Sequence, residues 1–340
     1  MIQAAIVGLG WWGKTLVESA QESDKLRFVA AATRTISAEA ETFAAEQGLR
    51  LVDGYEALLA DADVDAVALA TPHSTHASQM IAAAQAGKHI FCEKPFTLTK
   101  RDAEAAVEAT RNAGVTVAVG YNRRFHPEMT KLRERIRSGG LGVVMHVEAT
   151  MTFPNALFLK PEQWRANREE TPGGGLTPMG VHAIDGMIDL CGEIDQVYCQ
   201  SFRRVVEIDS DDTTSMLFRM KEGMSGYLGT VTATGPGFSF EVFGSEGRLR
   251  LDGMTHVAGA SSEERRTRLF GACRFQPIKG PAEVWEAEPF DSARAALEAF
   301  ADAASGAAPY PITPDEMIHG AAVTEAVVRS AASGSVERVP

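Results

Sequence analysis

Short apolar runs alternate with amphipathic stretches through the first 120 residues of the chain. The apolar runs predict strands over residues 2–7, 26–32, 51–52, 65–70, 89–92 and 115–119. The amphipathic stretches predict a helix that follows the first strand to residue 22, and further helices over 38–46, 55–59, 75–86 and 100–113. Strands that alternate with helices pair in parallel, and six of them match a Rossmann sheet with helices on both faces.

The pattern changes after residue 122, where strand-like runs follow one another with few helices between them. Strands are predicted over residues 143–152, 196–206, 213–220, 224–232, 239–243 and 248–251, and helices over 127–137, 180–190, 292–304 and 314–332. Consecutive strands favour antiparallel pairing. We therefore predict the α/β class, with a dinucleotide-binding Rossmann domain over residues 1–122. Residues 123–340 are expected to form a substrate-binding and oligomerisation α+β domain with an open, mostly antiparallel sheet.

The composition limits the kinds of molecule that the chain is expected to bind. The 340 residues carry a formal net charge of −12, which opposes nonspecific binding to nucleic acid. No apolar run approaches the roughly 18 residues that a membrane-spanning helix needs. The amino terminus lacks a signal-peptide pattern, so we expect a cytoplasmic protein that binds neither membrane nor nucleic acid. The spacing of the 4 cysteines fits neither a zinc site nor a disulfide scaffold, and we expect no bound metal.

A glycine-rich turn joins the first predicted strand to the first predicted helix. Its sequence, Gly8-Leu9-Gly10-Trp11-Trp12-Gly13, fits the G-x-G-x-x-G pattern of dinucleotide-binding proteins. Gly8 permits the tight turn, Gly10 lets a pyrophosphate approach the backbone, and Gly13 lets the helix pack closely on the sheet. The helix amino terminus supplies amides and a positive dipole end. Trp11 and Trp12 lie in the same turn, where they either shield the cofactor or pack against the protein.

The end of the second predicted strand distinguishes the two nicotinamide cofactors. An acidic residue at this place would bind the ribose 2′-hydroxyl of NAD. Thr33 and Arg34 stand there instead, with no carboxylate nearby. A guanidinium suits a 2′-phosphate, so NADP(H) is preferred and NAD(H) is the alternative. The alternative is that Arg34 only stacks on the adenine or faces solvent.

Several short motifs occur at intervals along the chain. They are Ala70-Thr71-Pro72 with His76, Ala86-Gly87-Lys88-His89, Glu93-Lys94-Pro95, Trp164-Arg165, Gly173-Gly174-Gly175-Leu176 and Gly180-Val181-His182-Ala183-Ile184-Asp185. Together they resemble the Gfo/Idh/MocA oxidoreductase family, which is named after glucose-fructose oxidoreductase and inositol dehydrogenase. The likeness runs from residue 8 to about residue 185, and the layout of the remainder is compatible with it.

The resemblance implies roles for the residues in these motifs. Lys94 would be a catalytic residue beside the nicotinamide, and His182 would be the acid/base group. Glu93 and Pro95 would shape the turn of Lys94, with a lysine–proline bond that is commonly cis in the family. The expected cofactor-binding residues outside the glycine-rich turn are Thr33, Arg34, Thr71, Pro72, His76, Glu93 and Lys94. Lys94 follows the fifth predicted strand, and ligands of parallel sheets bind beyond the carboxyl ends of the strands.

One position departs from the pattern of the family. An aspartate usually stands four residues before the histidine, where this chain has Pro178. Asp185 lies three residues after His182, about one helical turn away, so the two side chains can share a helix face. We therefore hypothesise that Asp185 or a group of the substrate takes over part of the function of the family's aspartate. The alternative is a structural carboxylate.

Three groups of polar and aromatic residues are predicted to line the substrate cleft. They are Tyr121, Asn122 and Arg123 after the sixth strand, Trp164, Arg165 and Arg168 farther along the chain, and Asn155. His182 would also contact the substrate. Several arginines near one cleft favour a carboxylated or otherwise anionic substrate.

The resemblance implies reversible hydride transfer between nicotinamide and a secondary alcohol of a sugar, cyclitol or related ring polyol. His182 would accept the alcohol proton near neutral pH. Lys94 would either stabilise the alkoxide as an ammonium or supply the transferred proton itself. A homodimer or homotetramer is expected. Two alternatives are a non-catalytic NADP-binding sensor or regulator, and a redox-neutral glycosidase that retains its cofactor.

Overall fold

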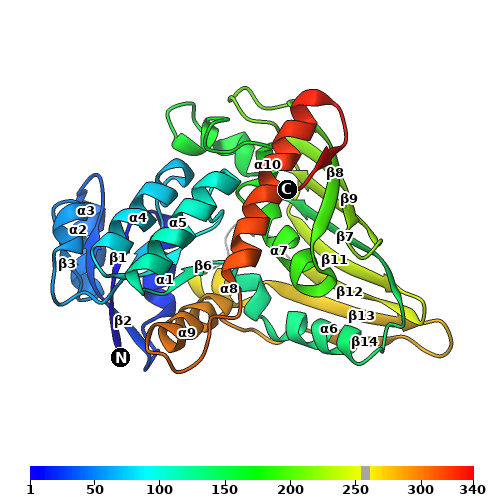
Figure 1. Ribbon diagram of the computed structural model, residues 1–340, viewed down its shortest axis with the longest axis horizontal. Helices are drawn as coiled ribbons and strands as arrows, with labels where there is room; N and C mark the ends of the chain where they lie inside the picture. The colour runs from blue at the N-terminus through cyan, green and yellow to red at the C-terminus, as the bar shows by residue number, and fades with distance from the viewer. Residues whose placement is uncertain (254–260) are drawn as a thin grey trace. The chain divides into compact units, whose positions relative to one another are not determined.

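The computed structural model describes residues 1–253 and 261–340, which form two compact units (Figure 1). The N-terminal unit contains Met1–Asn122 and Ala293–Ile318, and the C-terminal unit contains Arg123–Ser292 and His319–Pro340. The first boundary therefore falls at residue 122, where the sequence pattern changes. Residues 293–318 were expected in the C-terminal domain, but they belong to the N-terminal unit.

Six parallel strands form the sheet of the N-terminal unit, in the order β3-β2-β1-β4-β5-β6. They are β1 (Ile2–Val7), β2 (Leu26–Ala32), β3 (Arg50–Leu51), β4 (Ala66–Leu69), β5 (His89–Cys92) and β6 (Val117–Val119). Every side chain of β4 is buried, as expected for a central strand with both faces covered. The predicted Rossmann sheet is confirmed.

The helices between these strands begin and end close to the capping residues and glycines of the sequence. They are α1 (Trp11–Ser19), α2 (Ala38–Glu46), α3 (Tyr55–Leu59), α4 (His76–Gln85) and α5 (Lys100–Ala113), and the single turn η1 (His73–Thr75) precedes α4. Thr99 accepts a hydrogen bond from the Asp102 amide at 3.1 Å and caps α5. Gly114, in the left-handed conformation, ends the same helix.

The segment that returns to the N-terminal unit contains most of α9 (Ser292–Ala304). The ring of Phe300 lies 5.8 Å from that of Phe91, between ring centroids, and both side chains are buried. The Tyr310 hydroxyl donates to the Val119 carbonyl at 2.7 Å. An amphipathic pattern does not reveal which sheet a helix covers, and for this reason the sequence assigned the segment to the wrong domain.

Nine strands form the open sheet of the C-terminal unit, in the order β14-β13-β12-β11-β7-β10-β9-β8-β15. They are β7 (Val144–Thr152), β8 (Ile194–Phe202), β9 (Thr213–Met220), β10 (Ser225–Val231), β11 (Gly237–Gly244), β12 (Gly247–Gly253), β13 (Phe270–Pro277), β14 (Glu283–Glu286) and β15 (Glu337–Arg338). Only β7 and β10 pair in parallel among the described strands. The mostly antiparallel sheet is confirmed, whereas β13, β14 and β15 were not predicted.

Helices cover one face of this sheet. Side chains of α6 (Pro127–Arg137), α7 (Gly180–Cys191) and α10 (Pro314–Ser333) share one apolar core with the inward side chains of the strands. Leu217, which points away from this core, is 55% exposed. Shorter helical turns are η2 (Asn122–Phe125), η3 (Asn155–Phe158), η4 (Trp164–Ala166), η5 (Gly174–Leu176) and α8 (Ser262–Thr267).

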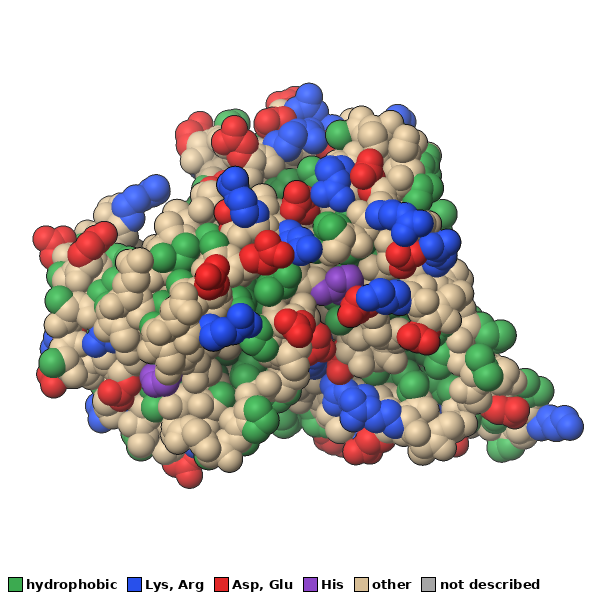
Figure 2. Space-filling view, in the orientation of Figure 1, with side chains coloured by type: hydrophobic (Ala, Val, Ile, Leu, Met, Phe, Trp, Pro, Cys, Tyr) green, Lys and Arg blue, Asp and Glu red, His purple; other side chains and the backbone are tan. Residues whose placement is uncertain are grey.

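On the face drawn in Figure 2, Lys and Arg side chains lie among Asp and Glu side chains and do not gather in one basic area. Across the described ranges, no helix combines the length and the apolar character needed to cross a membrane. All 4 cysteines are buried and free, and burial raises the pKa of Cys191 and Cys199 to about 12.

Candidate functional site

The glycine-rich turn between β1 and α1 is held close to the end of β4. Gly8 has a φ of +97°, which only glycine adopts readily, and a Cβ there would lie 2.6 Å from the Ala70 carbonyl oxygen. A Cβ on Gly13 would collide with the Gly8 carbonyl. A Cβ on Gly10, in contrast, would meet nothing within 4 Å. Gly8 and Gly13 are thus required by the fold, while Gly10 borders open space.

The amino terminus of α1 suits a phosphate group. Gly10 is the N-cap residue and supplies no side-chain acceptor, and the first turn carries no acidic residue. Helix amides and the dipole therefore face the open space at Gly10 without a competing carboxylate. Trp11 and Trp12 flank this end, with ring centroids 5.4 Å apart. These features favour a diphosphate at the turn, and its binding there stays a prediction.

Arg34 follows β2 and is exposed. Its guanidinium makes no hydrogen bond or ion pair with any residue that the structure describes. Glu39, in the first turn of α2, binds the Lys14 ammonium, and Ser37 caps the helix by accepting from the Ala40 amide. Glu39, one of the two acidic residues in the first turn of α2, is therefore already paired, and no ion pair among the described residues neutralises Arg34.

The turn after β4 is fastened to the helix that follows it. The Thr71 hydroxyl donates to Gln79 at 2.6 Å. The ring of His76 lies between two carbonyl oxygens, with Nδ1 2.8 Å from that of Pro95 and Nε2 3.2 Å from that of Thr71. These contacts connect the turn that follows β4 to the turn that follows β5. His76 was expected to bind the cofactor, and both of its ring nitrogens contact backbone carbonyls.

The turn after β5 carries Lys94. The Lys94–Pro95 peptide bond is cis, as the family resemblance implied. The Lys94 amide donates to the carboxylate of Glu93 at 3.2 Å. That carboxylate is buried against the end of β6, where a Cβ on Gly120 would lie 2.5 Å from its Oε1 atom. Gly120 therefore makes room for Glu93, which in turn holds the backbone of Lys94.

The residues after β6 divide between the two units. Tyr121 and Asn122 are buried at the end of the N-terminal unit, and Arg123 begins the C-terminal one. The Arg123 guanidinium lies 4.4 Å from the ring centroid of Phe238, and only 6% of this arginine is exposed. Burial lowers its pKa to about 10, so it remains charged at neutral pH. This stacked position gives Arg123 a firm place in the core of its unit.

His182 is the third residue of α7, and Asp185 follows it in the same helix. Both oxygens of Asp185 accept from Arg124, at 2.7 Å from Nη2 and 3.2 Å from Nε. Asp185 and Arg124 are both buried, so each neutralises a charge that would otherwise be costly. This pairing supports the structural alternative for Asp185. Its direct part in catalysis stays a prediction.

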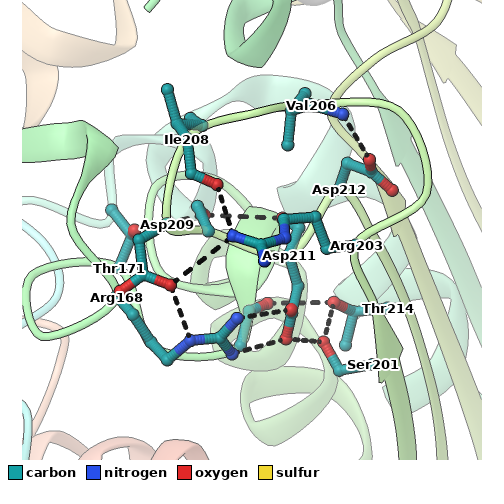
Figure 3. Close-up of polar contacts among 12 residues, drawn as sticks. Arg168, Thr171, Ser201, Arg203, Val206, Ile208, Asp209, Asp211, Asp212 and Thr214 are labelled. Carbon is teal, nitrogen blue, oxygen red and sulfur yellow. Dashed lines mark hydrogen bonds and ion pairs between the residues drawn. The ribbon is translucent and has the colours of Figure 1, made fainter. Parts of the chain in front are cut away.

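Arg168 joins two loops of the C-terminal unit (Figure 3). Its Nη1 and Nη2 atoms donate to Asp211 at 3.0 and 2.9 Å, and its Nε atom lies 3.4 Å from Asp209. Burial opposes the ionisation of Asp211, but bonds from Arg168 and Ser201 outweigh it and lower the pKa of this carboxyl. Carboxylates of the same unit thus neutralise the charge of Arg168. This pairing weakens the case for an anionic substrate. Its contact with substrate stays a prediction.

The other residues expected at the substrate lie on the surface of the same unit. Trp164 and Arg165 belong to η4, where the guanidinium lies 4.0 Å from the centroid of the tryptophan ring. Asn155 begins η3 and is exposed. The Gly173–Gly175 stretch packs closely, since a Cβ on Gly174 would collide with the Asp211 carbonyl. These residues share a unit with His182.

Two structural partners escaped the sequence reasoning. Arg124 binds Asp185, and Asp212 accepts from the amides of Arg204, Val205 and Val206 at 2.9, 2.7 and 3.1 Å. Arg124 directly follows Arg123, but nothing in its spacing indicates a partner 61 residues away.

Comparisons with known proteins decide the family. A model described as an oxidoreductase family with an NAD-binding Rossmann fold matches residues 2–121, and the GFO/IDH/MocA C-terminal domain matches residues 129–250. The chain belongs to the Gfo/Idh/MocA oxidoreductase family. The expected family, fold and enzyme class are thereby confirmed.

Relatives of this Gfo/Idh/MocA oxidoreductase include dehydrogenases of cyclitols and sugars. The myo-inositol 2-dehydrogenase of Thermotoga maritima is 30% identical over 62% of this chain and 63% of that protein. The D-xylose 1-dehydrogenase (NADP(+)) 2 of Haloferax volcanii is 26% identical over 97% of both. The crystal structure of an oxidoreductase from Desulfitobacterium hafniense has a TM-score of 0.90, with 26% identity over 99% of this chain and 97% of that one.

The contrast between Gly10 and Gly13 gives a first prediction for this Gfo/Idh/MocA oxidoreductase. Gly10→Ala should fold like the parent chain, because its methyl group enters open space, but should weaken dinucleotide binding about tenfold or more. The checks are thermal unfolding without cofactor and titration of tryptophan fluorescence with NADPH and NADH. Gly13→Ala, whose methyl group meets backbone, should lower the unfolding temperature as well. Unchanged affinity in Gly10→Ala would show that the diphosphate does not approach Gly10.

Proposed function

We propose that this chain catalyses reversible hydride transfer between nicotinamide and a secondary alcohol carbon of a sugar, cyclitol or related ring polyol. The observation that carries the proposal is the place of Lys94, which lies just beyond the carboxyl end of β5 in a NAD-binding sheet. Ligands of such sheets bind at this edge. The named relatives that act on myo-inositol and D-xylose support the substrate class.

The nicotinamide group, when bound, accepts or returns the hydride. The side chains of the protein supply the proton transfer and the charge stabilisation that the reaction also needs. Alcohol oxidation removes one hydride and one proton, and the neutral imidazole of His182 is suited to take the proton near pH 7. The Lys94 ammonium either stabilises the alkoxide oxygen or takes part in the proton transfer. Asp185, held by Arg124, keeps the first turns of α7 in place.

A substitution of Lys94 tests the catalytic assignment. Lys94→Ala should bind dinucleotide with nearly the parent affinity, yet lose about 10²- to 10⁴-fold in kcat, because a positioned acid/base or charge-stabilising group is gone. The measurement is nicotinamide absorbance with a panel of ring polyols and both cofactors. Lys100→Ala, at the start of α5, is the control and should keep its rate. Near-normal turnover by Lys94→Ala contradicts the assignment.

We infer a preference for NADP(H), supported by the unneutralised charge of Arg34 beyond β2. Arg34→Ala should weaken NADP binding by roughly 10- to 100-fold, the usual worth of a charge-assisted hydrogen bond, and leave NAD binding almost unchanged. Dissociation constants for the two cofactors measure this directly. Arg27→Ala is the matched control, since Arg27 is exposed near the opposite end of the same strand. Equal losses for NAD and NADP would refute the preference.

We also propose a homodimer or homotetramer that uses the face of the large sheet opposite its helices. On that face Tyr198, Leu217 and Tyr227 stand side by side on β8, β9 and β10. An exposed leucine between two tyrosines is a typical interface composition. Leu217→Asp should therefore lower the sedimenting mass to that of a monomer or smaller assembly. Ile278→Asp, on an exposed turn between β13 and β14, should leave the mass unchanged. A monomeric parent chain would sink this proposal.

A further inference from the structure

His76 occupies a place that its family motif does not explain. It is the first residue of α4, and its side chain is fully buried, with 0% exposed. Both ring nitrogens lie within hydrogen-bonding distance of backbone carbonyls that come from two different turns. The imidazole therefore spans the gap between the end of β4 and the end of β5, at the edge of the sheet where ligands bind.

The two contacts of His76 are not equivalent. Carbonyl oxygens only accept, and a neutral imidazole donates from one nitrogen. Nδ1 is 2.8 Å from the Pro95 oxygen, whereas Nε2 is 3.2 Å from the Thr71 oxygen. The shorter distance assigns the donated hydrogen to Nδ1. The firm bond thus holds Pro95, the residue directly after Lys94.

The backbone of Lys94 is consequently held on both sides. On one side the Lys94 amide donates to Glu93, whose carboxylate is lodged against Gly120. On the other side the carbonyl of Pro95 accepts from His76. Because the backbone is held at Glu93 and at Pro95, few backbone rotations remain at Lys94. These two contacts therefore set the direction in which the Lys94 side chain leaves the turn.

The other ring nitrogen, Nε2, carries no hydrogen in this tautomer, so it packs against the Thr71 carbonyl without a hydrogen bond and places His76 beside the cofactor cradle. Thr71 follows Ala70, whose carbonyl oxygen lies close against Gly8. A Cβ on Gly8 would be only 2.6 Å from this oxygen. A continuous series of contacts therefore leads from the glycine-rich turn through Ala70, Thr71 and His76 to Pro95. This series consists of one hydrogen bond and close packing, and it limits the distance between the place that suits the diphosphate and the lysine.

We propose that His76 is a positioning residue for hydride transfer, which sets the Lys94 ammonium relative to the glycine-rich turn and does not itself bind the cofactor. The inference rests on the proposed function, in which Lys94 is catalytic. It concerns a different property, however, since Lys94 could be catalytic whether or not His76 holds its turn.

Two variants separate the contacts of His76. The amide nitrogen of an asparagine can take the place of Nδ1, and that of a glutamine can take the place of Nε2, so each variant keeps one contact and loses the other. His76→Asn should retain kcat within about threefold. His76→Gln should lose kcat by about 10- to 100-fold, because an error of about 1 Å at a reacting group has effects of this order.

The readouts distinguish positioning from cofactor binding and from simple loss of structure. Dissociation constants for NADPH, measured by tryptophan fluorescence without substrate, should change less than about threefold in both variants, and KM for the polyol should change little. His89→Asn is the control, since His89 lies at the opposite end of β5 and accepts from the Thr116 amide at 3.0 Å. It should keep the parent kcat even where its unfolding temperature falls.

A double substitution tests whether His76 acts through Lys94. In a Lys94→Ala background, His76→Gln should change kcat less than about twofold, because residues that act as a unit are not additive. Full additivity, equal kcat for His76→Asn and His76→Gln, or a rise in the NADPH dissociation constant would each overturn the positioning role. Near-normal turnover in Lys94→Ala alone would instead overturn the proposed function, so the two failures are distinguishable.

Discussion

The close approach of backbone to backbone at the carboxyl edge of the parallel sheet is the constraint on which the cofactor-binding half of this enzyme depends. The glycine-rich turn can lie against Ala70 only because Gly8 has no side chain, and α1 can start where it does only because Gly13 has none. A third glycine, Gly120, plays the same part for the carboxylate of Glu93. At each of these places the missing Cβ sets how near two segments can come, and therefore where the neighbouring polar groups stand.

The C-terminal unit organises its polar groups by charge. Arg124 and Asp185 neutralise each other within the core, and Arg168 and Asp211 do so between two loops. Asp212 collects three backbone amides of one loop. Burial opposes the ionisation of Asp211 and Asp212, but the bonds from these partners lower the pKa of both carboxyls, and each partner would be costly to remove. The loops around η4 and η5 are therefore held by the Arg168–Asp211 ion pair as well as by apolar packing of Ala156, Ala166 and Ile208.

The sequence predicted the N-terminal sheet well, because β1, β2, β4 and β5 are buried apolar runs bounded by glycine or capping residues. The cradle glycines and the turn of Lys94 were likewise visible as motifs. It missed β13, whose sequence mixes small and polar residues with its apolar ones, and β14, a short strand with a glutamate at each end and no buried side chain. The pairing of Arg124 with Asp185 and of Arg168 with Asp211 was also missed, since partners 61 and 43 residues apart leave no mark in local spacing. The role of His76 needed the distance to Pro95, 19 residues farther along the chain.

The return of residues 293–318 to the N-terminal unit has a consequence for the biosynthesis of this enzyme. Phe91 in β5 packs against Phe300, and Val119 in β6 receives its hydrogen bond from Tyr310, about two hundred residues later in the chain. Domains generally fold as units while the ribosome is still translating. Here the nucleotide-binding sheet emerges first but lacks part of its cover until nearly the whole polypeptide has been made. A nascent chain would thus carry an apolar patch for most of its synthesis, and chimaeras that exchange this unit must transplant two separate stretches of sequence.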